Sequence, residues 1–392
     1  MTAESSPLVA RLVAGPVVDG PLNGVRTTVK ELVAVRGVAL SANTDVELPA
    51  ALTAPEHETP VVGLLRDAGA RIASIATTHE LAWGITTWAG GRRVANPLVE
   101  GRVAGGSSGG VAGLIAAGAV ELGIGTDTAG SVRIPAAWCD VVGWKPTFDL
   151  VSTDHVLPLA PGFDTVGFLA RDVGLLATVA EILGVDDADD RPLRIAELHV
   201  PGATSDPRLG PVIADALARL DVAGHDVTRA IEGPEAATLV DTYATLQLDA
   251  SLDAHRDVLG SWPEQADRYG EAIRRRLRAA ERLDATTVAA AQERQVALRA
   301  TADTWFTGVD ALVLPTTGCP PPTQDRPDEV DIDGDWHDLR SVVLPHTTIA
   351  NLLGAPAVNV PARIGDEPTG VQLLTPAGTD GRALRLAAQL VP

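Results

Sequence analysis

The sequence is poor in cysteine and in long apolar runs, and each shortage excludes a class of protein. Two cysteines in 392 residues, Cys139 and Cys319, are too few for a disulfide framework or a cysteine zinc site. The longest uncharged run, Val103 to Val120, holds six glycines and two serines in 18 residues. Such a run is too flexible and too weakly apolar to span a membrane. With no basic segment before a short apolar one at the N-terminus, we expect a soluble, cytoplasmic protein without a membrane partner.

Positive charge is also scarce. The chain has 31 basic and 51 acidic residues, a formal net charge of −20. Because a chain this acidic repels phosphate backbones, we predict no nucleic-acid partner. Only two of the basic residues are lysines, Lys30 and Lys145, and the other 29 of the 31 are arginines. Because arginine fills nearly all basic positions, the two remaining lysines are expected at sites where arginine cannot substitute. A buried lysine can act as a base, whereas arginine stays protonated.

Strands and helices alternate along the chain, which predicts an α/β fold with a sheet flanked by helices. A small-residue helix is expected over 109–120, packed closely against a neighbour. The region 236–306 is predicted to be largely helical, with Asp284 as a candidate cap for its last helix. The remaining candidates are strands over 25–30, 71–76, 163–170, 193–198, 310–315, 357–360 and 370–374, and helices over 59–70 and 206–222.

Glycine, serine, threonine and aspartate gather in residues 101–147, and several binding motifs can be excluded there. No lysine follows the glycines as a P-loop requires, and no GxSxG elbow occurs. A dinucleotide fingerprint is disfavoured because Thr126, Asp127 and Thr128 do not resemble the end of a second strand. His79 begins HELAW rather than HExxH, so we predict no metal site. What remains is a Ser-Ser pair between glycines, a TAGS segment and an upstream lysine, which suit serine nucleophiles with a lysine base. A lone GGSSGG is equally typical of a flexible surface loop.

Residues Gly105–Pro135, GGSSGGVAGLIAAGAVELGIGTDTAGSVRIP, resemble the signature of the amidase signature family of serine hydrolases. Further segments follow in the family's order: PLNGVRTTVKELVAVRG, ANP, GWKPT, FDTVGFLARD, LVLPTTGCPPP, NLLGAPAVNVP and GVQLL. The resemblance covers the chain except about residues 185–305. The segments FDTVGFLARD and LVLPTTGCPPP, together with the compact length of the chain, are most similar to small indole-3-acetamide hydrolase-type amidases.

The resemblance implies a mixed central β-sheet sandwiched between helices, in one amidase domain over residues 1–392. It implies a Ser–cis-Ser–Lys triad in which Ser131 is the nucleophile, Ser107 follows a cis peptide bond and Lys30 is the base. The backbone N–H groups of Thr128, Ala129, Gly130 and Ser131 would form the oxyanion hole. No cofactor or metal is implied. The variable region at about 185–305, Leu239 to Trp262 in particular, would shape the substrate pocket.

Several positions depart from the family pattern. Ala129 stands where a glycine is common, Glu31 replaces an aspartate after the lysine and Ala104 replaces a proline. Lys145, which precedes a proline, is expected to be structural, and Asp127 and Arg133 are expected to support the nucleophile loop. Two further groups have an ordinary structural interpretation: the arginines at 274, 275, 276 and 278 as a solvated helix face, and the tryptophans at 83, 88, 138 and 144 as core residues.

The sequence therefore predicts an amidase that cleaves the C–N bond of a small carboxamide through an acyl-enzyme. Two alternatives stay open: a component of an amidotransferase-type complex that passes ammonia to a partner, and a hydrolase of urea-derived amides such as allophanate. A homodimer is the default assembly.

Overall fold

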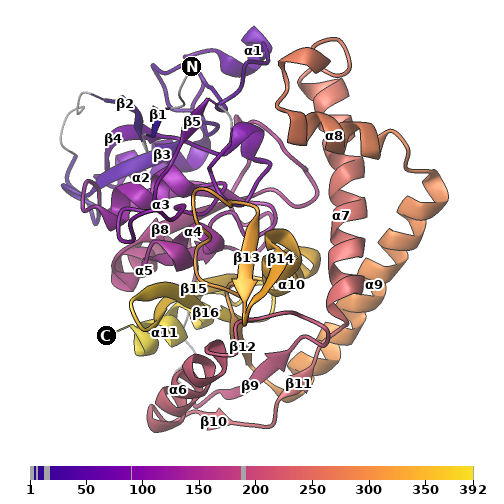
Figure 1. The fold of residues 1–392 in the computed structure, drawn as a ribbon. Coiled ribbons are helices and arrows are strands. Elements are labelled where there is room, and N and C mark those ends of the chain that lie inside the picture. Colours follow the sequence, from indigo (N-terminus) through magenta and orange to yellow (C-terminus); the bar gives the residue numbers. More distant parts are fainter. Residues whose placement is uncertain (1–3, 6–7, 13–17, 90, 187–190, 392) are drawn as a thin grey trace.

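A large mixed β-sheet forms the centre of the computed structural model, which describes residues 4–5, 8–12, 18–89, 91–186 and 191–391 (Figure 1). Its strands are β2 (Leu8–Arg11), β3 (Arg26–Lys30), β4 (Arg71–Ala76), β6 (Leu122–Asp127), β7 (Val142–Lys145), β8 (Thr165–Ala170), β9 (Arg194–His199), β10 (Asp226–Val227), β11 (Ile231–Glu232), β12 (Ala311–Pro315), β15 (Ala357–Ile364) and β16 (Glu367–Leu374). They run in the order β10-β9-β12-β16-β15-β7-β8-β6-β3-β4-β2, and β11 also pairs with β9. Parallel pairs such as β3–β6 and antiparallel pairs such as β6–β8 occur in the same sheet. Two short pairs lie apart from it: β1 (Glu4–Ser5) with β5 (Arg92–Arg93), and β13 (Glu329–Ile332) with β14 (Asp335–Asp338).

Helices pack against this sheet, which confirms the predicted α/β fold with a mixed central sheet (Figure 1). They are α1 (Ala50–Thr53), α2 (Pro60–Asp67), α3 (Gly109–Ala116), α4 (Arg133–Trp138), α5 (Val173–Ile182), α6 (Leu209–Val222), α7 (Ala236–Asp253), α8 (Glu271–Ala280), α9 (Ala285–Gly308), α10 (Leu339–Leu353) and α11 (Asp380–Leu390). No helix among the described residues is long and apolar enough to cross a bilayer.

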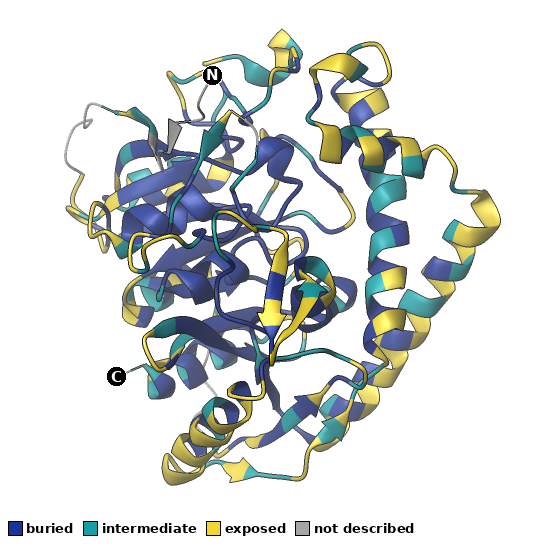
Figure 2. Ribbon diagram, viewed as in Figure 1, coloured by how far each residue is buried: buried dark blue, intermediate teal, exposed yellow. Residues whose placement is uncertain are grey.

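The three helices α7, α8 and α9 stand together along one side of the sheet-containing body (Figure 1). They confirm the predicted helical region, and the Asp284 carboxylate caps α9 by accepting a hydrogen bond from the Thr287 N–H at 2.7 Å. Much of the outer surface of α9 is exposed, whereas most residues of α7 are buried or half-buried (Figure 2). Because α10 packs on both α7 and α9, the helical group is joined to the body through α10.

One expectation was wrong: Thr126 and Asp127 do end a strand, β6. The reason is the pair of glycines inside it. A Cβ added to Gly123 would lie 2.2 Å from the Val111 side chain, and one added to Gly125 would lie 2.8 Å from the Ser108 hydroxyl. Both neighbours belong to α3 or its first turn, so the glycines let the helix lie close against the strand. This contact confirms that the small-residue helix is closely packed, and it places the end of β6 beside the Ser-Ser pair.

Candidate active site

The site lies where two neighbouring parallel strands end. Strands β3 and β6 pair in parallel, with Val29 opposite Ile124, so Lys30 and Thr126 leave the sheet at the same edge. Crevices at the carboxyl ends of strands are common places for ligands in open α/β sheets. Here the arrangement brings together the predicted base and the loop that carries Ser131.

Lys30 is completely buried and makes short polar contacts with two hydroxyls. Its Nζ lies 2.8 Å from the Ser107 Oγ and 2.8 Å from the Thr126 Oγ1, with the Thr126 carbonyl at 3.5 Å. Burial lowers the pKa of Lys30 to about 7, although the charges of Asp127, Asp164 and Glu31 oppose the shift. In its charged form Lys30 donates to all three of these oxygens, whereas the neutral amine has one lone pair that can accept a proton.

The GGSSGG segment is held in place by hydrogen bonds to the main chain of Ser107, and its Gly106–Ser107 peptide bond is cis. The Ser107 carbonyl accepts hydrogen bonds from the His79 N–H at 3.1 Å and from the hydroxyls of Thr78 and Thr87 at 3.0 and 3.2 Å. A Cβ at Gly106 would lie 2.7 Å from the Thr87 Oγ1, so a side chain would push this loop off its support. The segment is therefore a fixed, buried loop rather than a flexible surface one.

The TAGS segment lies directly against that loop. The Ser108 N–H donates to the Ser131 carbonyl at 3.1 Å, so the chain at Ser107 and the chain at Ser131 are adjacent. Ser131 is 4% exposed and sits between β6 and α4. The structure thus brings Lys30, Ser107 and Ser131 together, and it places a direct contact between the first two.

The four N–H groups of the expected oxyanion hole differ in their availability. The Gly130 N–H donates to the Asp127 carboxylate at 2.8 Å and is therefore already occupied. Among the described residues, no hydrogen bond is found from the N–H groups of Thr128, Ala129 or Ser131. The Thr128 hydroxyl donates to the Asp164 carboxylate at 2.7 Å, which fixes the first of these residues. Ala129 tolerates its Cβ because the residue of this turn with positive φ is Gly130, at +111°.

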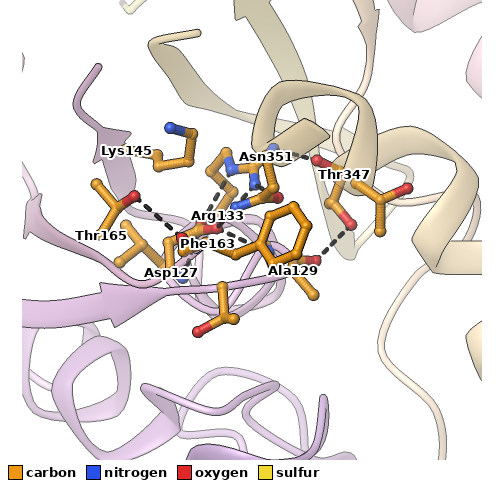
Figure 3. A network of polar contacts seen from close by, with 12 residues as sticks. Asp127, Ala129, Arg133, Lys145, Phe163, Thr165, Thr347 and Asn351 are labelled. Atoms are coloured by element: carbon orange, nitrogen blue, oxygen red, sulfur yellow. Dashed lines mark hydrogen bonds and ion pairs between the residues drawn. The ribbon is translucent and has the colours of Figure 1, made fainter. Parts of the chain in front are cut away.

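A buried ion pair between Asp127 and Arg133 supports the turn that carries Ser131 (Figure 3). The Asp127 carboxylate and the Arg133 guanidinium lie 2.8 Å apart, and both side chains are fully buried. The charge of Arg133 keeps the pKa of Asp127 well below its usual range, although burial alone would raise it. Asn351 of α10 bonds both partners, and the Thr347 hydroxyl donates to the Ala129 carbonyl at 2.7 Å. The expected supporting role of Asp127 and Arg133 matches these contacts.

Other residues singled out in the sequence lie around this centre. Lys145 is fully buried, its Nζ donates to the Pro146 carbonyl at 2.7 Å, and burial lowers its pKa to about 7. Glu31 accepts hydrogen bonds from Ser41 and from the Thr78 N–H and pairs with Arg92, so it braces the loops behind Lys30. No group of three or more histidine, cysteine, aspartate or glutamate side chains is placed to hold a metal ion within the described part of the chain.

Comparison with known proteins identifies the family of this chain. A model of the Amidase family matches residues 13–384. The chain belongs to the Amidase family. It is therefore an enzyme, a hydrolase that acts on amide C–N bonds.

Relatives and solved structures agree with this assignment. The chain is 32% identical to a glutamyl-tRNA(Gln) amidotransferase subunit of Natronomonas pharaonis, over 96% of this chain and 97% of that protein. It is 30% identical to the 2-amino-5-chloromuconic acid deaminase of Comamonas testosteroni, over 94% of this chain and 81% of that protein. A crystal structure of an amidase superposes with a TM-score of 0.84 at 30% identity, over 95% of this chain and 85% of that chain.

One arginine that was expected on a solvated helix face packs against Trp83 instead. Arg276 of α8 donates from Nη1 to the Trp83 carbonyl, and its guanidinium lies 5.7 Å from the centre of the Trp83 ring. Arg275 and Arg278 on the same helix are exposed, as expected. Because Trp83 is far away in the sequence, the pattern of α8 alone held no signal for this contact.

Proposed function

We propose that this amidase hydrolyses a small carboxamide through an acyl-enzyme on Ser131, with Ser107 as proton relay and Lys30 as base. The observation that carries the proposal is the 2.8 Å contact between Lys30 Nζ and Ser107 Oγ, made by a buried lysine whose pKa is lowered to about 7. A lysine in this state is ready to accept a proton near neutral pH, as general-base catalysis requires.

The proton moves in one direction during acylation and returns when the amine leaves. Ser131 attacks the amide carbon while its proton passes to Ser107 and the Ser107 proton passes to Lys30. The N–H groups of Thr128, Ala129 and Ser131 bind the negatively charged oxygen of the tetrahedral intermediate. Lys30 then returns a proton through Ser107 to the departing nitrogen, and the C–N bond breaks. Water repeats the sequence on the acyl-enzyme and releases the acid.

The nucleophile is tested by labelling with a fluorophosphonate probe. We expect the wild-type chain to form one adduct, at Ser131, and Ser131→Ala to form none while keeping the wild-type melting temperature. Ser152→Ala, at a loop residue of partial exposure, is the matched control and should label normally. Undiminished labelling of Ser131→Ala would show that another serine is the nucleophile.

A second function is favoured by one observation, the similarity to an amidotransferase component over nearly the whole of that protein. In this alternative the chain releases ammonia only for a partner. Purified chain alone, assayed for ammonia release from simple amides, separates the two: steady turnover supports the free amidase, and release that requires an added partner supports the amidotransferase role.

The substrate class within the amidases stays a prediction. An indole-3-acetamide-type aryl-acetamide is the first candidate from the sequence, and a carboxylated urea such as allophanate is the other. We expect a panel of both kinds of amide to show a difference in kcat/KM large enough to assign the class.

A further inference from the structure

His79, which begins the HELAW segment, lies directly beside the proposed relay serine. Its main-chain N–H donates to the Ser107 carbonyl at 3.1 Å, and the residue is 8% exposed. The imidazole is turned toward its own loop, where its Nδ1 accepts a hydrogen bond from the Thr87 N–H at 3.1 Å. The reaction proposed above makes no use of this ring, although its main chain supports the residue that relays the proton.

The hydrogen bond to Thr87 fixes the form of the imidazole. Because Nδ1 accepts, it carries no proton, and the single ring proton of the neutral form lies on Nε2. Burial lowers the pKa of His79 to about 3, with smaller contributions from the positive charges of Arg276, Arg340 and Lys30. The ring is therefore neutral from about pH 5 upward. It acts as a hydrogen-bond acceptor and carries no charge.

Three hydrogen bonds join His79, Thr87 and Ser107 into a closed ring. The His79 N–H and the Thr87 hydroxyl both donate to the Ser107 carbonyl, the hydroxyl at 3.2 Å, and the Thr87 N–H donates to the imidazole. The Thr87 hydroxyl also accepts from the Gly109 N–H at 3.3 Å, so it contacts the GGSSGG segment on both sides of Ser108. Removing the imidazole would open one side of this ring and leave the Thr87 N–H without its acceptor.

The loop between His79 and Thr87 has an unfavourable main-chain conformation. Leu81, Ala82 and Thr87 have positive φ angles of 49°, 59° and 50°. A β-branched residue such as threonine rarely adopts this conformation, and it persists only where the surrounding contacts enforce it. The imidazole supplies one of these contacts. It fits inside the loop because Gly84 has no side chain: a Cβ there would lie 2.2 Å from the His79 ring.

We propose that His79 is a positioning residue: its imidazole closes the 79–87 loop onto Thr87, and the closed loop keeps Ser107 in contact with Lys30. The inference rests on the relay function proposed above for Ser107. Without the imidazole, we expect Thr87 to relax and the Ser107 main chain to move, which lengthens the 2.8 Å contact between Ser107 Oγ and Lys30 Nζ. Water then reaches Lys30, and its pKa rises from about 7 toward 10.5, because the burial that lowers it is partly lost.

Two amide variants test whether the acceptor at Nδ1 is what matters. The Asn Oδ1 lies as many bonds from the main chain as the His Nδ1, whereas the Gln amide reaches the position of Nε2. We therefore expect His79→Asn to keep the wild-type kcat and pH profile. His79→Gln should lower kcat about 10- to 100-fold with little change in KM, because the relay is misplaced and no substrate contact is lost. Its acid limb of kcat/KM should also move up by about one pH unit.

Neither variant changes a charge, because the wild-type ring is neutral. The carboxylates that act on Lys30 also stay in place: Asp127, Asp164 and Glu31. A changed pH profile therefore reports a changed environment of Lys30 and not a lost charge. His337→Gln, at a half-buried histidine of β14, is the matched control and should leave kcat and the profile unchanged.

The scarcity of lysine allows a second measurement that needs no turnover. A chain labelled with isotope-enriched lysine gives NMR signals from two side chains, Lys30 and Lys145, and Lys145→Met assigns them. We expect the Lys30 signal to titrate with a midpoint near 7 in the wild type, in His79→Asn and in His337→Gln. The midpoint should be higher in His79→Gln. If His79→Gln does not fold, Gly84→Ala displaces the same ring and should give the same higher midpoint.

The results separate this inference from the proposed reaction. A wild-type kcat and an unchanged Lys30 midpoint in His79→Gln, or in Gly84→Ala where that variant replaces it, would overturn the positioning role while the amidase proposal stands. Equal losses in His79→Asn and His79→Gln would also overturn it, because the acceptor at Nδ1 would then not be what matters. A higher midpoint in His79→Gln, in a protein whose wild type turns over no amide, would support the positioning role and overturn the proposed reaction.

Discussion

Lowering the pH should protonate Lys30 and stop the reaction over a range that the structure specifies. Burial lowers the pKa of this lysine from 10.5 to about 7. At pH 7 about half of Lys30 is therefore neutral, whereas only about 3 in 10,000 of ordinary lysines are. Burial thus increases the amount of available base by about 1,000-fold at neutral pH.

The expected profile follows from this single ionisation. Since the neutral form is the active one, kcat/KM should rise with pH and level off above about pH 8. It should fall about ten-fold between pH 8 and pH 6, and about a hundred-fold between pH 8 and pH 5. Initial rates of ammonia release at low substrate concentration measure kcat/KM directly, and each pH requires a melting control.

Two variants connect the profile to the right lysine. Lys145 is also buried with a pKa near 7, so its titration would give a similar curve. Lys145→Met removes that titration with little change in shape and should keep the profile, because Lys145 contacts neither serine. Lys30→Arg stays charged and should lose about 10²–10⁴-fold in rate at every pH. A folded Lys30→Arg chain with near-normal turnover, or a wild-type rate that falls from pH 6 to pH 9, would refute the assignment of the base.

Three further outcomes follow from the turn that holds Ser131. Gly130→Ala should fold poorly or lose activity, since φ is +111° and the new Cβ would lie 2.7 Å from the Thr347 side chain; a melt and probe labelling measure both. Asp127→Asn leaves the Arg133 charge buried without its partner and should cost about 3–5 kcal/mol of unfolding free energy in urea titrations, against no more than about 0.5 kcal/mol for exposed Asp221→Asn. Thr347→Val removes the bond to the Ala129 carbonyl and should lower kcat more than it raises KM; an unchanged kcat would show that the turn holds itself.

The sequence was most informative where an unusual composition, the scarcity of lysine, falls on a residue type that the proposed reaction needs. Two lysines among 31 basic residues identified Lys30 as a base candidate, and the structure places it against Ser107. Strand β6 was missed because its glycines carry no side-chain pattern, and their purpose, the close approach of α3, is visible only in three dimensions.

Contacts between distant segments explain the remaining differences. Nothing in the arginine-rich stretch of α8 distinguishes Arg276 from its neighbours, because the Trp83 that it covers lies on another element. The occupied N–H of Gly130 could not be anticipated either, since the family pattern describes which residues form the turn and not which atoms are already bonded. Sequence reasoning predicted residues that share a motif, and it did not predict partners that only the fold brings together.

The buried pair of Asp127 and Arg133 has a consequence for the order in which the chain matures. The Arg133 guanidinium also donates to Thr347, Asn351 and Gln372, which follow it in the sequence by 214, 218 and 239 residues. Contacts of such long sequence separation form late, because the entropy of a long loop must be lost first. A nascent chain that lacks these residues therefore contains Lys30, Ser107 and Ser131, but the turn that orients Ser131 is not yet stabilised. Activity should therefore appear only after Gln372 has been synthesised and has joined this network, later than the synthesis of the proposed catalytic residues themselves.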